Sequence, residues 1–117
     1  MTIAKPDGGR VAFFNHVAYF AGHVSSMPFE SFQEQLEAIL QRYDGLFLQY
    51  GLQKKNILMM FAYLKDIADM AVFEEIFRPW HGGDAPPGVA VQAQCMGPDR
   101  LIEISFIVAQ EEQEERK

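Results

Sequence analysis

The stretch that decides the fold is Asp84-Ala-Pro-Pro-Gly-Val-Ala-Val-Gln92, followed by Asp99-Arg-Leu-Ile-Glu-Ile104. It predicts a strand entered from a proline-stiffened loop, then a short turn and a second strand. The second strand carries one carboxylate, Glu103, among apolar residues. Because burying a lone carboxylate is costly, this acid is expected to be paired, hydrated or functional.

Two strands and a helix are predicted upstream. The strands, 11–14 and 17–20, flank Asn15-His16, where Asn tolerates a positive φ and favours a tight hairpin. The helix has Ser31 and Glu34 at capping-box spacing, Pro28 as an earlier alternative start and Gly51 as its C′ residue. Its buried face is expected to carry residues at three- and four-residue intervals: Phe32, Leu36, Ile39, Leu40, Tyr43, Phe47 and Tyr50.

The second half of the chain predicts strand, helix, strand and strand. Residues 56–64 are apolar at both odd- and even-numbered positions, so this strand should be covered on both faces. Asp66 is expected to cap a helix whose last turn is disturbed by Pro79. The last two strands are predicted over 89–95 and 101–109.

The order β-β-α-β-α-β-β indicates an α+β domain, with a mixed sheet and two helices on one face. We expect one domain over 1–117, with an N-terminal extension over 1–10 and a mobile charged tail over 110–117. Two helices leave the opposite sheet face without a cover. Self-association, sheet face against sheet face with crevices between chains, is the economical solution.

Composition narrows the partners. The 117-residue chain has a net charge of −6 and no cluster of Lys and Arg in its sequence, so a nucleic-acid partner is not expected. It has no apolar run of membrane-spanning length, and its one cysteine, Cys95, favours a reducing cytoplasm. The three histidines lack ligand spacing, so we expect neither a metal nor another cofactor.

The order of elements resembles the Rid family (RidA/YjgF, formerly endoribonuclease L-PSP) over 11–109. The similar pieces are Val17-Ala-Tyr-Phe-Ala-Gly-His23, Tyr63-Leu-Lys-Asp66, Ala85-Pro-Pro87 and Ile102-Glu-Ile104. The resemblance implies a chorismate-mutase-like fold and a homotrimer with small-molecule clefts at the subunit interfaces. It also implies hydrolysis of enamines or imines to 2-oxo acids and ammonia.

The resemblance carries over a site residue by residue. Glu103 matches the family's water-handling glutamate, and Gly22 with His23 is placed at the substrate cleft. The carboxylate-gripping arginine of the family corresponds to Gly88, the cysteine that often follows it to Ala90, and a cleft asparagine to Glu74. A lost bidentate charged contact costs on the order of 2–5 kcal/mol, so efficient 2-imino-acid deamination is not expected.

Each of these residues also has a structural interpretation. Glu103 is either a general base or an acid hydrogen-bonded across an interface. Gly88 is better explained as a strand-entry glycine approached closely by another backbone. His23 is more often a surface or interface histidine than a proton carrier. Cys95 is interpreted as a small core residue.

Three residues are candidates for a substitute anion clamp: Lys65, Arg78 and Arg100, the last expected to face solvent. Three functions follow. The first is a divergent Rid-type hydrolase of an enamine, imine or related carbonyl compound that uses Glu103. The second is a non-catalytic small-molecule-binding or scaffold trimer. The third is RNA cleavage, which the acidic charge disfavours.

Overall fold

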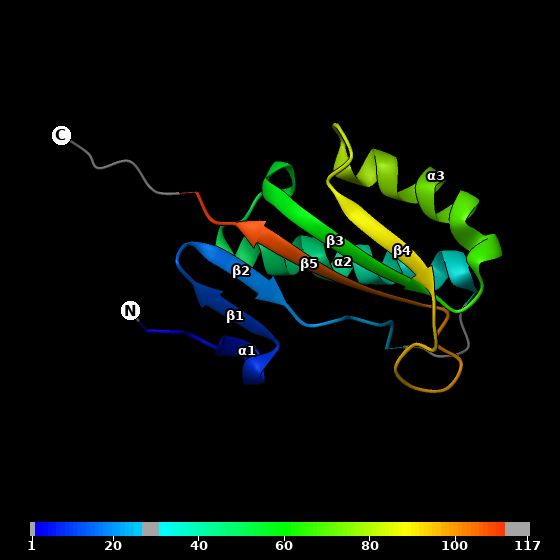
Figure 1. Ribbon diagram of the computed structural model, residues 1–117, viewed down its shortest axis with the longest axis horizontal. Helices are drawn as coiled ribbons and strands as arrows, with labels where there is room; N and C mark the ends of the chain where they lie inside the picture. The colour runs from blue at the N-terminus through cyan, green and yellow to red at the C-terminus, as the bar shows by residue number, and fades with distance from the viewer. Residues whose placement is uncertain (1, 27–30, 112–117) are drawn as a thin grey trace.

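The computed structural model describes residues 2–26 and 31–111. They form a five-stranded sheet in the order β1-β2-β5-β3-β4, with α2 running along it and α3 beside β4 (Figure 1). The elements are α1 (Pro6–Gly9), β1 (Val11–Phe14), β2 (Val17–Phe20), α2 (Phe32–Tyr50), η1 (Lys54–Asn56), β3 (Ile57–Leu64), η2 (Ile67–Asp69), α3 (Met70–His81), β4 (Gly88–Gln92) and β5 (Ile102–Ala109).

The sheet is mixed, as predicted. β1 pairs with β2, β2 with β5 and β5 with β3, all antiparallel. β4 pairs with β3 in parallel, because α3 carries the chain back across the sheet between them. β4 ends at Gln92 rather than at the predicted residue 95. The α+β order of strands and main helices is confirmed.

Local signals placed the hairpin and the first main helix correctly. Asn15 and His16 have φ of 54° and 64°, as the tight turn between β1 and β2 requires. Ser31 and Glu34 form both hydrogen bonds of a capping box, and Gly51 ends α2 in the left-handed region. The alternative start at Pro28 lies outside the described residues.

Pro79 lies in the last turn of α3, where the sequence predicts a disturbance. The helix continues to His81, and Gly82, at φ 80°, donates its N–H to the carbonyl of Arg78 at 2.9 Å. A proline this close to the C-terminus removes one intrahelical hydrogen bond and leaves the next amides free to bond. The last turn therefore lacks one hydrogen bond, but the helix does not end at the proline.

Aromatic residues hold both helices to the sheet. The ring of Phe106 on β5 lies 4.6 Å from that of Tyr43 on α2 and 5.9 Å from that of Trp80 on α3. The Tyr43 hydroxyl donates to the carbonyl of Ile104 at 2.9 Å, which satisfies a polar group inside the core. Both helices therefore cover the sheet face that carries Phe106.

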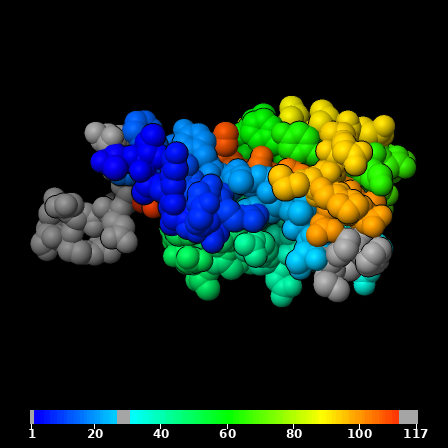
Figure 2. Space-filling view, turned by 90° about the horizontal axis from the view of Figure 1, so that it is seen from below, coloured from blue at the N-terminus to red at the C-terminus, as the bar shows by residue number. Residues whose placement is uncertain are grey.

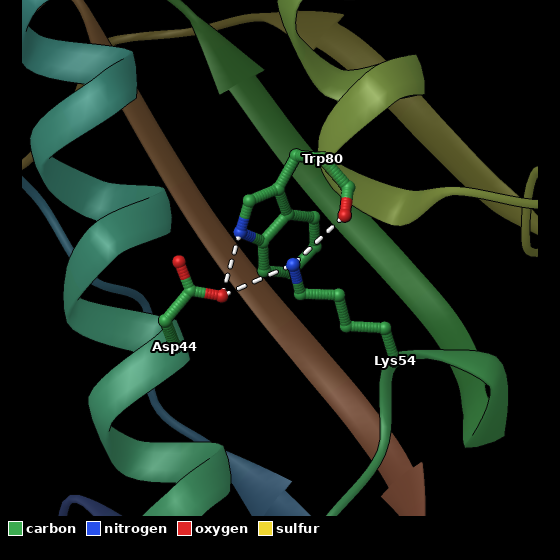
Figure 3. A network of polar contacts seen from close by, with 3 residues as sticks. All are labelled: Asp44, Lys54 and Trp80. Carbon is green, nitrogen blue, oxygen red and sulfur yellow. Dashed lines mark hydrogen bonds and ion pairs between the residues drawn. The ribbon is translucent and has the colours of Figure 1, made fainter.

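A polar network joins α2, η1 and α3 at the edge of this core (Figure 3). The indole N–H of Trp80 donates to Asp44 Oδ1 at 3.0 Å, and Lys54 Nζ lies 3.1 Å from the same oxygen. Lys54 also donates to the carbonyl of Trp80 at 2.8 Å and lies 4.2 Å from the centre of its ring. One lysine therefore links two helices.

The opposite face of the sheet has no cover among the described residues. Along β5, alternate residues are fully buried and half-exposed. The half-exposed residues and their neighbours define what we call the open face: Tyr19, Met59, Phe61, Tyr63, Val89, Val91, Glu103, Ser105 and Ile107. Val89 is 46 % exposed and Tyr19 is 44 % exposed. The helices thus cover one face only, as the element order predicted.

Candidate active site

Glu103 lies on the open face, near the start of β5. It is directly opposite Tyr63 of β3 in the antiparallel register. Its Oε1 accepts the backbone N–H of Met96 at 3.0 Å, so the carboxylate is fixed rather than free to rotate. The acid is half-exposed, which leaves it accessible from the uncovered side of the sheet.

Gly22 lies against this carboxylate. A Cβ added to Gly22 would collide with Oε2 of Glu103, and the Cγ of Glu103 would lie 3.0 Å away. The absence of a side chain is therefore what allows Oε2 to lie where it does. Gly22 and Glu103 are the two site residues that the structure brings together within one chain.

Cys95 lies beside this pair but is not prepared as a nucleophile. Its thiol is buried and lies 3.3 Å from the carbonyl of Tyr63, to which it donates. Burial, and to a lesser extent the negative charge of Glu103, raise the pKa of the Cys95 thiol. A thiol that keeps its proton fits the interpretation of Cys95 as a small core residue.

His23 is not the surface or interface histidine that was expected. It pairs with Ile104 through the backbone, so its side chain enters the helix-covered core and is 1 % exposed. The imidazole stacks on Tyr43 at 4.9 Å. Burial, followed by the charges of Arg10 and Arg42, lowers the His23 pKa to about 4, so the ring is neutral near pH 7. It therefore faces away from Glu103.

Gly88 and Ala90 also lie on the other side of the sheet from Glu103. Gly88 pairs with Met60, and a Cβ there would lie 2.9 Å from the carbonyl oxygen of Met60 and 3.2 Å from its Cβ. Gly88 is thus the closely approached strand-entry glycine of our structural interpretation. Ala90, two residues further along β4, lies on the same face of the sheet as Gly88 and pairs with Ala62. Neither faces the carboxylate within one chain.

The remaining candidates are dispersed. Glu74 is exposed on α3, where it lines a shallow surface hollow of about 480 Å³ with Glu75 and Arg78. Arg100 does not face solvent freely as expected. It is half-buried and lines a second pocket with Arg10 and Arg42. Sequence spacing could not reveal that pocket, since its arginines come from three separate segments.

The arrangement can hold one water or a small polar group at a fixed carboxylate, next to the aromatic ring of Tyr63. The hydrogen bond from the Met96 N–H and the pairing with Tyr63 were not predicted from the sequence, because they depend on loop geometry and strand register.

No group of three His, Cys, Asp or Glu side chains within 2–26 and 31–111 is arranged to hold a metal ion. None of the helices described there has the length and apolar character to cross a membrane.

Known proteins are similar to this chain in fold and, to about a third of aligned residues, in sequence. The family model for endoribonuclease L-PSP matches residues 10–110. A RutC family protein of Haemophilus ducreyi is 30% identical over 100 residues, covering 85% of this chain and 86% of its own. A second RutC family protein, from Haemophilus influenzae, is 33% identical over 99 residues, covering 83% and 85%.

Solved structures agree with the family model. A YjgF-family protein from Neisseria meningitidis superposes with a TM-score of 0.86 at 23% identity, covering 97% of this chain and 98% of its own. A putative translation initiation inhibitor from Salmonella typhimurium gives 0.83 at 26% identity, covering 92% and 97%. The resemblance seen in the sequence is thereby confirmed, and the chain belongs to the Rid/YjgF family, the family of the endoribonuclease L-PSP model.

Proposed function

We propose that this protein is a divergent Rid-type hydrolase that acts on a small imine, enamine or related carbonyl compound. The observation that carries the proposal is the fixed carboxylate of Glu103, held by the Met96 N–H and lying over Gly22 on the open face. The cleft is completed by other copies of the chain in a homotrimer, whose subunits cover one another's open faces.

The chemistry assigns one role to Glu103. Its carboxylate takes a proton from a bound water as the water oxygen attacks the carbon of the C=N bond. The π electrons of that bond move to nitrogen, which is protonated. The resulting carbinolamine then breaks its C–N bond, so that ammonia leaves and a carbonyl group remains. One water is consumed for each ammonia released.

The preferred substrate lacks a carboxylate beside the reacting carbon. Gly88 provides no cation at the position that matches the family's arginine, and the Met60 carbonyl leaves no room for a longer side chain. Losing a bidentate charged contact costs on the order of 2–5 kcal/mol. The same feature supports a second candidate, a trimer that binds a small molecule without converting it. RNA cleavage has less support, because the chain has a net charge of −6.

Ammonia release tests the proposal. Wild type and Glu103→Gln are compared on 2-iminobutanoate and on an imine without a carboxylate. We expect turnover of the second compound only, and a loss of roughly 100-fold in Glu103→Gln, which is typical for removal of a general base. Rates on 2-iminobutanoate equal to those of an arginine-bearing relative would contradict the Gly88 argument.

A matched pair of glycine substitutions links the rate to the geometry. Gly22→Ala pushes Glu103 aside and should lower kcat with it, whereas Gly45→Ala, with nothing within 4 Å of the added Cβ, should leave the rate unchanged. If neither imine reacts while a small ligand binds saturably to the wild type, the non-catalytic binding function replaces the hydrolase.

A further inference from the structure

A pocket on the helix-covered side of the molecule gathers three arginines from distant parts of the chain. Arg10 follows α1, Arg42 lies within α2 and Arg100 precedes β5. They line a pocket of about 350 Å³ together with Ser25 and Ser26, which follow β2. Figure 2, a view from below Figure 1, shows residues near 20–26 (light blue) between the N-terminal segment (blue) and the loop before β5 (orange).

The three guanidinium groups have no acidic partner in the described part of the chain. The ion pair found there joins Lys54 to Asp44, and neither of these residues lines the pocket. Arg100 donates to the carbonyl of Pro98 at 3.4 Å, but its Nε is buried with no hydrogen-bond partner among the described residues. A buried donor without a partner is costly, so an acceptor at this pocket would be stabilising.

Two of the arginines that line the pocket act on the same buried group. The charges of Arg10 and Arg42 both lower the pKa of His23, and a guanidinium nitrogen of Arg10 lies 3.3 Å from His23 Nδ1. Asp7 is the acid that opposes them. The neutral imidazole carries no charge that could offset the arginines. Like charges gathered in this way repel one another unless an anion binds between them.

We infer that this pocket binds a phosphate group, as free phosphate or as a small phosphate monoester. Three guanidinium forks suit a tetrahedral dianion, whose oxygens point in several directions, better than a planar carboxylate that engages one fork. The buried Ser25 and the exposed Ser26 add short polar residues to the lining. A pocket of this size, at the low end for small-molecule sites, fits the phosphate and a small organic remainder.

This site is separate from the proposed catalytic one. The open face carries Glu103, whereas the pocket is lined by Ala38 and Arg42 of α2, on the helix-covered side. Phosphate binding is therefore expected to be the same in wild type and in Glu103→Gln. The two proposals can fail independently of each other.

Calorimetric titration tests the inference at fixed ionic strength, since exposed charges are screened by salt. Inorganic phosphate and methyl phosphate are titrated into wild type, Arg42→Gln, Arg100→Gln and Arg78→Gln. Arg78 is the matched control, because it is an exposed arginine on α3 outside the pocket. We expect one phosphate per chain, affinity at least about tenfold weaker in the first two variants, and a change of less than about twofold in the control.

The same titration separates the sources of the phosphate. Methyl phosphate binding as tightly as inorganic phosphate, or more tightly, indicates a monoester as ligand, and its exclusion indicates the free ion. Absence of saturable phosphate binding, equal binding of acetate, or an unchanged affinity in Arg42→Gln each overturns the inference. Glu30 lies outside the described residues, so Glu30→Gln is included. If Glu30→Gln binds phosphate and the wild type does not, the Glu30 carboxylate is the occupant of the pocket. That result would also overturn the inference.

Discussion

The imidazole of His23 is a titratable group in an environment that differs clearly from water. It stacks on Tyr43, and its Nδ1 lies 3.1 Å from the carbonyl of Ala21. Its Nε2 has no partner among the described residues. Since Nδ1 also lies close to Arg10, one tautomer cannot satisfy both contacts. The ring is therefore held by packing more than by hydrogen bonds, and protonating it would place a charge in the core.

This burial predicts a pH-dependent stability. The pKa of His23 falls from 6.5 to about 4 on folding, so the unfolded chain binds the proton more tightly. Keeping His23 neutral contributes fully to the free energy of unfolding above about pH 6.5. This contribution, up to about 3 kcal/mol, is lost as the pH falls toward 4. Urea unfolding at about pH 7 and about pH 4.5 should show a larger loss for wild type than for His23→Gln. Equal losses in the two proteins would mean that another group is responsible.

Between elements, the network of Asp44, Lys54 and Trp80 fixes how α3 returns to α2. Two of its contacts are side chain to side chain, and the third uses the carbonyl of Trp80 near the end of α3. The Lys54 side chain is 33 % exposed and that of Asp44 47 % exposed, so water screens the ion pair. Its effect on stability should accordingly be modest.

A double-mutant cycle measures that effect. Asp44→Ala and Lys54→Ala, alone and together, should give a coupling energy of about 0.5–1 kcal/mol in urea unfolding at low salt. Gln33 and Glu37, which are hydrogen-bonded at 3.3 Å on the exposed face of α2, provide the control pair with a smaller coupling. A coupling that does not fall with added salt would show that the Trp80 contacts, rather than the ion pair, hold the helices.

The elements were predictable because their signals are local. A capping box at Ser31, a left-handed Gly51 and the Asn15-His16 turn are read from a few neighbouring residues, and each is where the sequence indicated. Pro79 was placed in the last turn of α3, where a proline removes one hydrogen bond while the helix still continues to His81. Gln35 was missed on the buried face because its amide bonds the backbone at Asp99 and Leu101, residues distant in sequence.

The site was less predictable, because it depends on contacts between residues that are distant in sequence. The resemblance selected Glu103 and Gly22, which do meet. It could not show that Gly88 and Ala90 face the opposite side of the sheet, since that depends on the register between β3 and β4. Nor could it bring Arg10, Arg42 and Arg100 together, because the cluster exists only after folding.

At the scale of the whole molecule, the open face is the surface through which we expect the protein to assemble. It exposes aromatic and aliphatic side chains across four neighbouring strands, including Phe61 near its centre and Val89 at its edge. A contiguous apolar patch of this kind on one sheet face is typical of a surface buried in an oligomer. We therefore expect the protein to associate through this face, with three subunits as in our proposal.

Light scattering coupled to size-exclusion chromatography tests the association. Wild type should have the mass of three chains, whereas Phe61→Glu should shift toward one chain because a carboxylate cannot be buried unpaired at the interface. Leu48→Glu is the control, since Leu48 is 85 % exposed on α2, away from the open face. A wild type that stays monomeric at micromolar concentration would remove the cleft on which the proposed hydrolase depends.

The segment ahead of β1 has a consequence for handling the protein. Ala4 and Phe13 exchange backbone hydrogen bonds of 3.1 and 2.8 Å, so Ala4 shields part of the outer edge of β1, the strand at the end of the sheet. An unshielded border can recruit strands from other molecules and seed precipitation. Removing the amino-terminal residues, or placing a bulky fusion against them, would therefore expose unpaired backbone N–H and C=O groups. Affinity tags are better attached at the carboxyl end.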